Sequence, residues 1–153
     1  MNAQDAEILL VEDNPADVEL SLRALKLNHI ANRISVARDG EEALDFIFGR
    51  GEHPDRRGEP LPRLVLLDLK LPKVDGLEVL RQIKGDPRTR SVPVVILTSS
   101  TEERDLINSY HLGANSYIQK PVEFTQFQEI VKQLGLYWLV VNEPPPSVRA
   151  AEA

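Results

Sequence analysis

The chain has 153 residues, enough for one domain with its own hydrophobic core but short for two. Its 18 Lys and Arg residues and 24 Asp and Glu residues give a net charge of −6, which argues against a nucleic-acid partner. The absence of Cys excludes disulfides, thiol catalysis and Cys-type metal sites. No apolar run is long enough for a membrane span, and the acidic start lacks the basic segment of a secretory signal, so we expect a cytoplasmic protein with no membrane partner.

Short apolar runs alternate with helical periodicity five times along the chain. The apolar runs cover residues 8–11, 34–37, 64–67, 92–97 and 116–118, and the helices are expected over 16–27, from 39, over 77–84, from 101 to 113, and from 123. The segment Thr101-Glu102-Glu103 is expected to open the fourth helix with a capping hydroxyl or first-turn acids. This alternation predicts an α/β fold in which a parallel, doubly wound sheet is covered on both faces.

Two segments interrupt the pattern. Residues 49–63 contain three Gly and three Pro without apolar periodicity, which indicates a long surface loop. After residue 141 the sequence Glu143-Pro144-Pro145-Pro146 favours an extended tail. We therefore predict one domain over residues 1–141 and a Pro-rich, extended or disordered tail over 142–153.

Polar residues follow four of the five predicted strands. They are Glu12, Asp13, Asp68, Thr98 and Lys120. Each alone has an ordinary explanation: a helix cap, a residue with high strand propensity, or a solvated charge. Parallel strands deliver their carboxyl ends to one edge of the sheet, however, and ligand sites of open α/β sheets lie at that edge.

The residue types narrow the chemistry of this edge. Clustered carboxylates repel one another and require a cation, and hard oxygen ligands favour Mg²⁺. A Lys and a Thr supply a positive charge and a hydroxyl donor for a phosphoryl group, and a carboxylate can act as the nucleophile. The set predicts phosphoryl transfer onto an Asp with Mg²⁺ as cofactor.

Four ordered motifs resemble the receiver domain of two-component response regulators: residues 11–14, 67–76, 97–99 and 120–121. The resemblance runs from about residue 8 to residue 135 and implies the five-stranded order 2-1-3-4-5. It also implies a role for each site residue. Asp68 would accept the phosphoryl group from the phosphohistidine of a sensor histidine kinase. Mg²⁺ would be bound by Asp13, Asp68 and the backbone carbonyl of Lys70, with Glu12 acting through water. The phosphoryl oxygens would be held by Thr98 and Lys120, and Tyr117 would be the switch aromatic.

A finer resemblance covers residues 109–122 and 136–139, together with the loop at 49–63. These segments are similar to the small stand-alone regulators paired with phytochrome histidine kinases, which implies a phytochrome as a possible kinase partner.

Two positions depart from the common receiver pattern. Lys70 stands where many receivers carry Asn or Met, and Ser100 is small. The Lys70 ammonium could pair with Glu12 or contact the phosphoryl group, so the lifetime of the phosphorylated state stays open.

For the switch, we expect Thr98 to reach the phosphoryl oxygens only by moving, and Tyr117 to turn inward behind it. The alternative for Tyr117 is a half-buried strand aromatic with no switching role.

No DNA-binding domain fits after the last predicted helix, so the expected output is a contact with a target protein or onward phosphotransfer. The apolar segment with Tyr137, Trp138 and Leu139 predicts a homodimer arm, and the alternative is that it packs on its own domain.

Three other functions compete with the receiver prediction. A phosphatase resembling the haloacid dehalogenase group would need a second Asp at position 70, where this chain has Lys. A non-phosphorylated pseudo-receiver would be a pure binding module, which the intact site argues against. A nucleotide-binding flavodoxin-like protein would need a Gly-rich phosphate loop, and none follows a predicted strand.

Overall fold

The computed structural model describes residues 7–27, 33–51, 53–56, 60–120, 123–135, 137–138 and 145. Five parallel strands form one sheet in the order β2-β1-β3-β4-β5, as predicted. The strands are β1 (Glu7–Val11), β2 (Arg33–Ala37), β3 (Leu64–Leu67), β4 (Val94–Thr98) and β5 (Ser116–Gln119). The helices are α1 (Pro15–Leu27), α2 (Gly40–Phe48), the short 3₁₀ helix η2 (Pro54–Arg56), α3 (Gly76–Gly85), α4 (Glu103–His111) and α5 (Phe124–Gly135).

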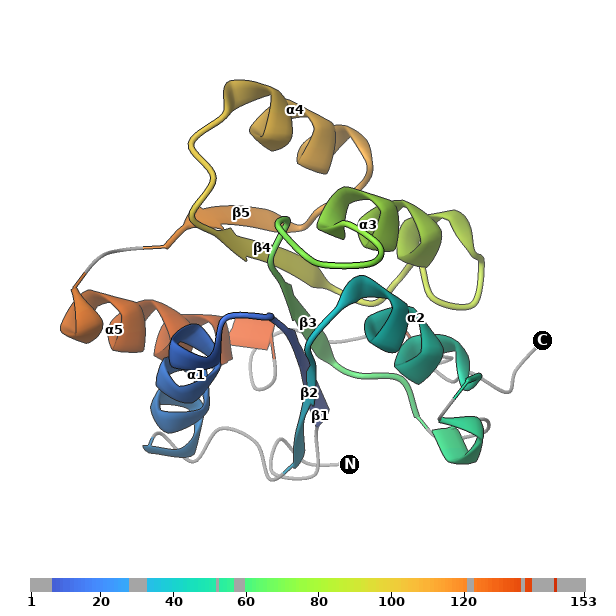
Figure 1. Ribbon diagram of the computed structural model, residues 1–153, viewed down its shortest axis with the longest axis horizontal. Helices are drawn as coiled ribbons and strands as arrows, with labels where there is room; N and C mark the ends of the chain where they lie inside the picture. The colour runs from blue at the N-terminus through green and yellow to red at the C-terminus, as the bar shows by residue number, and fades with distance from the viewer. Residues whose placement is uncertain are drawn as a thin grey trace.

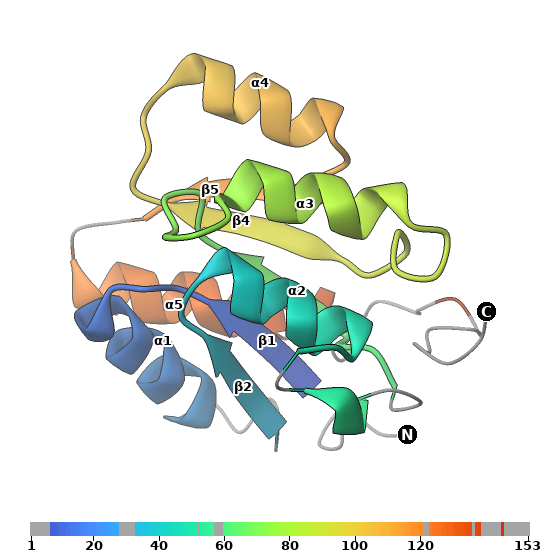
Figure 2. The same cartoon turned by 45° about the vertical axis from the view of Figure 1, so that its right-hand side comes forward.

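The sheet is covered on both faces, with α1 and α5 on one side and α2, α3 and α4 on the other (Figures 1 and 2). Side chains of a strand alternate between the two faces. In β1, Ile8 and Leu10 pack with α1 and α5, whereas Leu9 and Val11 pack with α2 and α3. This two-sided burial explains why β1, β3 and β4 are almost continuously apolar, and it fixes the strands whose ends carry the site.

Acidic caps begin the two helices next to the site. The Asp39 carboxylate accepts from the backbone N–H of Glu42 at 2.7 Å, and Asp75 accepts from Glu78 at 3.0 Å. In contrast, α4 begins at Glu103, two residues later than expected, and its N-cap residue Glu102 makes no side-chain capping bond. Of the two alternatives that the sequence left open, a capping hydroxyl at Thr101 is not found, and an acid in the first turn is confirmed by Glu103.

Several boundaries differ from the predictions by one or two residues. The fourth strand begins at Val94, because Pro93 precedes the first residue that pairs with β3. Within the predicted loop at 49–63, η2 adds local order and Leu61 is buried, so that its described part is not wholly a surface segment. Residues 52 and 57–59 of that loop lie outside the described part.

Helix α4 is unusual because its polar side faces inward. Its two buried residues are Asp105 and Ser109, whereas Leu106, Ile107 and Tyr110 are exposed. The helix therefore presents an apolar surface to solvent, which we call the α4 apolar face (Leu106, Ile107 and Tyr110).

The start of the predicted dimer arm lies at the end of the described chain. Trp138 is half-buried and packs against the core beneath α1 and α5, while Tyr137 remains 51% exposed. The Trp138 contact favours packing on its own domain. Leu139, the predicted boundary at residue 141 and the tail, except for exposed Pro145, lie outside the described residues.

Among the residues that the structure describes, no helix is long and apolar enough to cross a membrane.

Candidate functional site

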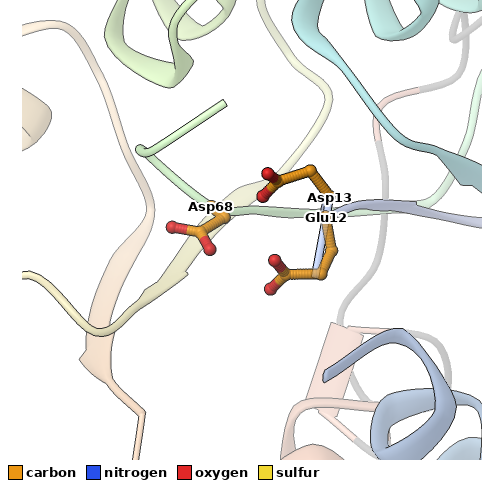
Figure 3. Close-up of side chains that lie close together, drawn as sticks. All are labelled: Glu12, Asp13 and Asp68. Carbon is orange, nitrogen blue, oxygen red and sulfur yellow. The ribbon is translucent and has the colours of Figure 1, made fainter. Parts of the chain in front are cut away.

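Strand register brings three acids together. Val11 at the end of β1 pairs with Leu67 at the end of β3, and the Asp68 N–H continues the ladder to the Val11 carbonyl at 3.1 Å. Glu12, Asp13 and Asp68 thus leave the sheet at one level, and carboxylate oxygens of all three lie within 4.8 Å of one another (Figure 3). Glu12 and Asp68 are buried and Asp13 is exposed.

A single ammonium binds three carboxylates at this edge. The backbone N–H of Lys120 donates to the Thr98 carbonyl at 2.8 Å, which fixes the segment after β5 beside β4. Its Nζ then donates to Asp17 at 2.8 Å, to Asp68 at 3.0 Å and to Glu12. The Lys120 side chain is largely buried, so these contacts act in a poorly solvated environment.

Thr98 already contacts the predicted acceptor. It is fully buried, and its Oγ1 donates to Asp68 Oδ1 at 2.7 Å. The Lys70 N–H donates to the same oxygen at 3.3 Å. Thr98 reaches the free carboxylate because the ends of the neighbouring strands β3 and β4 lie side by side. The expected movement of Thr98 toward phosphoryl oxygens concerns the phosphorylated state and stays a prediction.

The cluster shifts three pKa values. Burial raises the pKa of Glu12 from 4.5 to about 7, and the negative charge of Asp68 adds to the rise. The hydrogen bond from Lys120 opposes the rise but does not cancel it. Burial alone would also raise the pKa of Asp68, but Thr98 and Lys120 outweigh it and lower the value below 3.8. Burial disfavours the Lys120 ammonium as well, yet Asp17, Glu12 and Asp68 raise its pKa above 10.5. At neutral pH Asp68 is therefore an ionised carboxylate.

The donor set fits a hard divalent cation. Three carboxylates converge at the cluster, and one ammonium among the described residues leaves them with excess negative charge. Oxygen ligands of this kind suit Mg²⁺ or Mn²⁺. Asp13 is exposed, so an ion can reach the cluster from solvent on its side.

Lys70 does not pair with Glu12, one of the two arrangements that the sequence left open. Its Nζ lies 3.8 Å from Asp105 Oδ2 of α4. Asp105 also accepts from the Ser100 hydroxyl at 2.6 Å, and this contact is buried. Asp13, Lys70 and Asp105 line an open pocket of about 490 Å³ beside the acid cluster.

Tyr117 is half-buried and packs against the core on the α2–α3 side of the sheet. Its hydroxyl donates to the Ser100 carbonyl at 3.3 Å, and its N–H donates to the Tyr110 hydroxyl at 3.2 Å. Tyr117 therefore connects β5 to the segment after β4 through its hydroxyl and to the α4 apolar face through its backbone N–H.

Sequence reasoning missed two acids of this edge. Asp17 lies in the first turn of α1, where an acid is ordinarily explained by the helix dipole. Asp17 follows Asp13 by four positions, and this spacing was the available sign that both acids belong to one edge. Asp105 lies in a helix whose apolar pattern suggests that it faces solvent, so the sequence carried no signal for its burial.

A model of the response regulator receiver domain matches residues 8–132. The chain belongs to this family. Among its relatives, the probable methanogenesis regulatory protein FilR2 of Methanothrix harundinacea is 46% identical over 138 residues, which cover 90% of this chain and 86% of FilR2. Response regulator Rcp1 of Synechocystis sp. is 42% identical over 132 residues, which cover 86% of this chain and 88% of Rcp1.

Solved receiver structures share the fold. The Mn²⁺-bound form of Rcp1 superimposes with a TM-score of 0.84 and 40% identity, covering 92% of this chain and 99% of that one. The bacteriophytochrome response regulator AtBRR has a TM-score of 0.72 and 55% identity, covering 91% and 99%. This chain is thus a receiver similar to regulators named for phytochromes and to one named for methanogenesis.

Proposed function

We propose that this receiver accepts a phosphoryl group on Asp68 from the phosphohistidine of a sensor histidine kinase. The observation that carries the proposal is the environment of the Asp68 carboxylate: it is buried and ionised, and it lies between the Thr98 hydroxyl and the Lys120 ammonium. An Asp68 oxygen attacks the phosphorus, the new P–O bond forms as the P–N bond to the histidine breaks, and the histidine nitrogen leaves.

The chain's own residues account for the other requirements of the transfer. Thr98 donates a hydrogen bond and Lys120 a positive charge toward the phosphoryl oxygens. Asp13, Asp68 and the Lys70 carbonyl would hold Mg²⁺, with Glu12 acting through water. When bound, Mg²⁺ would offset the negative charge of the phosphoryl group. The Mn²⁺-bound form of Rcp1 and the carboxylate cluster support this assignment.

The test is the intact mass of the protein after incubation with Mg²⁺ and a small-molecule phosphodonor. We expect a gain of one base-labile phosphoryl group in the wild type and in the control Asp55→Asn, an exposed site remote from the cluster, and no gain in Asp68→Asn. No gain in the wild type with Mg²⁺ bound would refute the acceptor role and favour the pseudo-receiver, a binding module without phosphate. Steady release of phosphate from simple esters would favour a phosphatase.

We further propose that the kinase is a phytochrome, which the similarity to AtBRR supports. The similarity to FilR2 points to another class of input, so the comparison must be direct. Purified phytochrome and non-phytochrome histidine kinases would be labelled and mixed with this chain. Faster transfer from the phytochrome supports the proposal, and equal or slower transfer refutes it.

The output, by this proposal, is a protein contact or onward phosphotransfer through the surface around α4, β5 and α5. The α4 apolar face supports it, and Tyr117 joins that face to the acceptor region through Ser100. A homodimer through Tyr137, Trp138 and Leu139 stays a proposal. Sedimentation of the wild type and of Tyr137→Ser tests it, and a wild type that is monomeric at all concentrations refutes it.

A further inference from the structure

Polar contacts form a closed path between the acceptor and α4. Lys70 donates its backbone N–H to Asp68 and extends its ammonium to Asp105. Asp105 accepts from the Ser100 hydroxyl, and the Ser100 N–H donates to Thr98 Oγ1 at 3.3 Å. Thr98 completes the path at Asp68. Lys70, two positions after the acceptor, is thus tied to a helix that contributes no residue to the proposed phosphoryl transfer.

Asp105 is an unexpected residue to find buried. Only 7% of it is exposed, on a helix that turns its apolar side to solvent. A buried carboxylate is costly unless it is paired. The Ser100 hydroxyl gives Asp105 one hydrogen bond, and the Lys70 ammonium is the cation within ion-pair distance among the described residues.

The Lys70 side chain has freedom to leave this contact. It is 62% exposed and lines the same open pocket as Asp13 and Asp105. A lysine carries its charge on four flexible methylenes, so the ammonium can turn toward either of two anions at the pocket. Asp105 is one of these anions, and a phosphoryl group on Asp68, with about −1.5 to −2 charges and three acceptor oxygens, would be the other.

We propose that Asp105 is a positioning residue for Lys70. It holds the ammonium on the α4 side of the pocket and away from the phosphoryl group, which keeps the phosphorus open to water. In hydrolysis, the water oxygen bonds to phosphorus as the bond from phosphorus to the Asp68 oxygen breaks. Asp68 returns as a carboxylate, and both protons of the water leave with the phosphate. An ammonium released from Asp105 binds the phosphoryl oxygens, covers this approach and slows the step.

The test compares the lifetime of the phosphorylated protein in four proteins: wild type, Asp105→Asn, Lys70→Gln and the double variant. Asn has the shape of Asp and still accepts from Ser100, so Asp105→Asn removes the charge while keeping the buried hydrogen bond. We expect Asp105→Asn to lengthen the lifetime about two- to fivefold, the range for a partly exposed ion pair. The double variant should have the lifetime of Lys70→Gln, because Asp105 acts through Lys70.

Two controls separate this role from a general effect on α4. Glu103→Gln removes an exposed charge from the same helix and should leave the lifetime unchanged, while Asp105→Glu should restore most of the wild-type value. Equal changes with and without Lys70, or no change in Asp105→Asn, would overturn the inference. The inference rests on the proposed function: a wild type that never gains phosphate would refute both, whereas normal loading with unchanged lifetimes would refute the positioning role alone.

Discussion

Removing the charge of Asp13 should stabilise the metal-free protein. The Asp13 carboxylate has oxygens within 4.8 Å of those of Glu12 and Asp68. The neighbouring acids already share the ammonium of Lys120, which no hydrogen bond among the described residues extends to Asp13. Asp13 therefore adds repulsion to a cluster that is short of positive charge, and Asp13→Asn relieves it with little change of shape.

The geometry sets the size of the effect. Two unit charges 4.8 Å apart repel by about 0.9 kcal/mol in water and by about 3.5 kcal/mol at an effective dielectric constant near 20. Asp13 is exposed, so the lower figure is the better guide for each pair, and Lys120 cancels part of the charge on both neighbours. We expect Asp13→Asn to raise the free energy of unfolding by about 1 kcal/mol without divalent ions.

In the presence of Mg²⁺ the wild type should be more stable than Asp13→Asn. An ion that binds only the folded protein adds about 2.7 kcal/mol at a free concentration near 100 times its dissociation constant, and Asp13→Asn loses a proposed ligand for it. Urea unfolding in chelator and in excess Mg²⁺ measures both effects, with Glu129→Gln as a control for the same change of net charge. The reasoning fails if Asp13→Asn is less stable than the wild type in chelator, or if Mg²⁺ stabilises both equally.

Three further changes test other parts of the structure. Burial raises the pKa of Glu12 from 4.5 to about 7, so between these pH values the folded state binds more protons than the unfolded chain. Wild-type stability, measured by urea titrations, should therefore fall by about 1–3 kcal/mol relative to Glu12→Gln as the pH rises from 4.5 to 7. A Cβ on Gly76 would lie 2.3 Å from the Asp68 carbonyl, so Gly76→Ala should cost about 1–3 kcal/mol and slow loading, whereas Gly85→Ala meets nothing within 4 Å and should raise the melting temperature slightly. Burial lowers the pKa of Lys84 from 10.5 to about 8, so wild-type stability should rise as the pH rises from about 8 to 10.5, and Lys84→Met should lack that rise. The variant should also lose about 1–3 kcal/mol of stability, because the Lys84 ammonium donates to three oxygen atoms in the wild type.

The sheet was predictable because burial on both faces imposes one simple pattern. Strands that pack under helices on two sides must be apolar at every position, and β3 with its run Leu64-Val65-Leu66-Leu67 is therefore recognisable alone. The ends of helices were less predictable. The start of α4 depends on the fold around Ser100, whose hydroxyl accepts from the Glu102 N–H, and not on a side chain within the helix.

The proximity of Glu12, Asp13, Asp68, Thr98 and Lys120 followed from strand-end logic, since parallel strands share one edge. Contacts made by side chains of helices could not be predicted in this way. Asp17 reaches Lys120 across 103 positions of sequence because α1 and α5 flank the same face of the sheet, and the side on which a helix turns is decided by packing.

The acid cluster and the core make opposite contributions to stability, and the fold joins them in the same strands. The acids that suit a cation and a phosphoryl group repel one another when neither is bound, and one ammonium shared by Glu12, Asp17 and Asp68 offsets only part of that repulsion. Strands β1 and β3, which Glu12, Asp13 and Asp68 follow, are buried along their whole length, as is β4, which ends in Thr98. Such a site can be held at fixed geometry because Glu12 and Asp68 follow directly after strands that are packed between apolar side chains on both faces. Substitutions in these strands should therefore disturb the site before they unfold the domain, whereas neutralising Asp13 should strengthen the metal-free fold and weaken the proposed function.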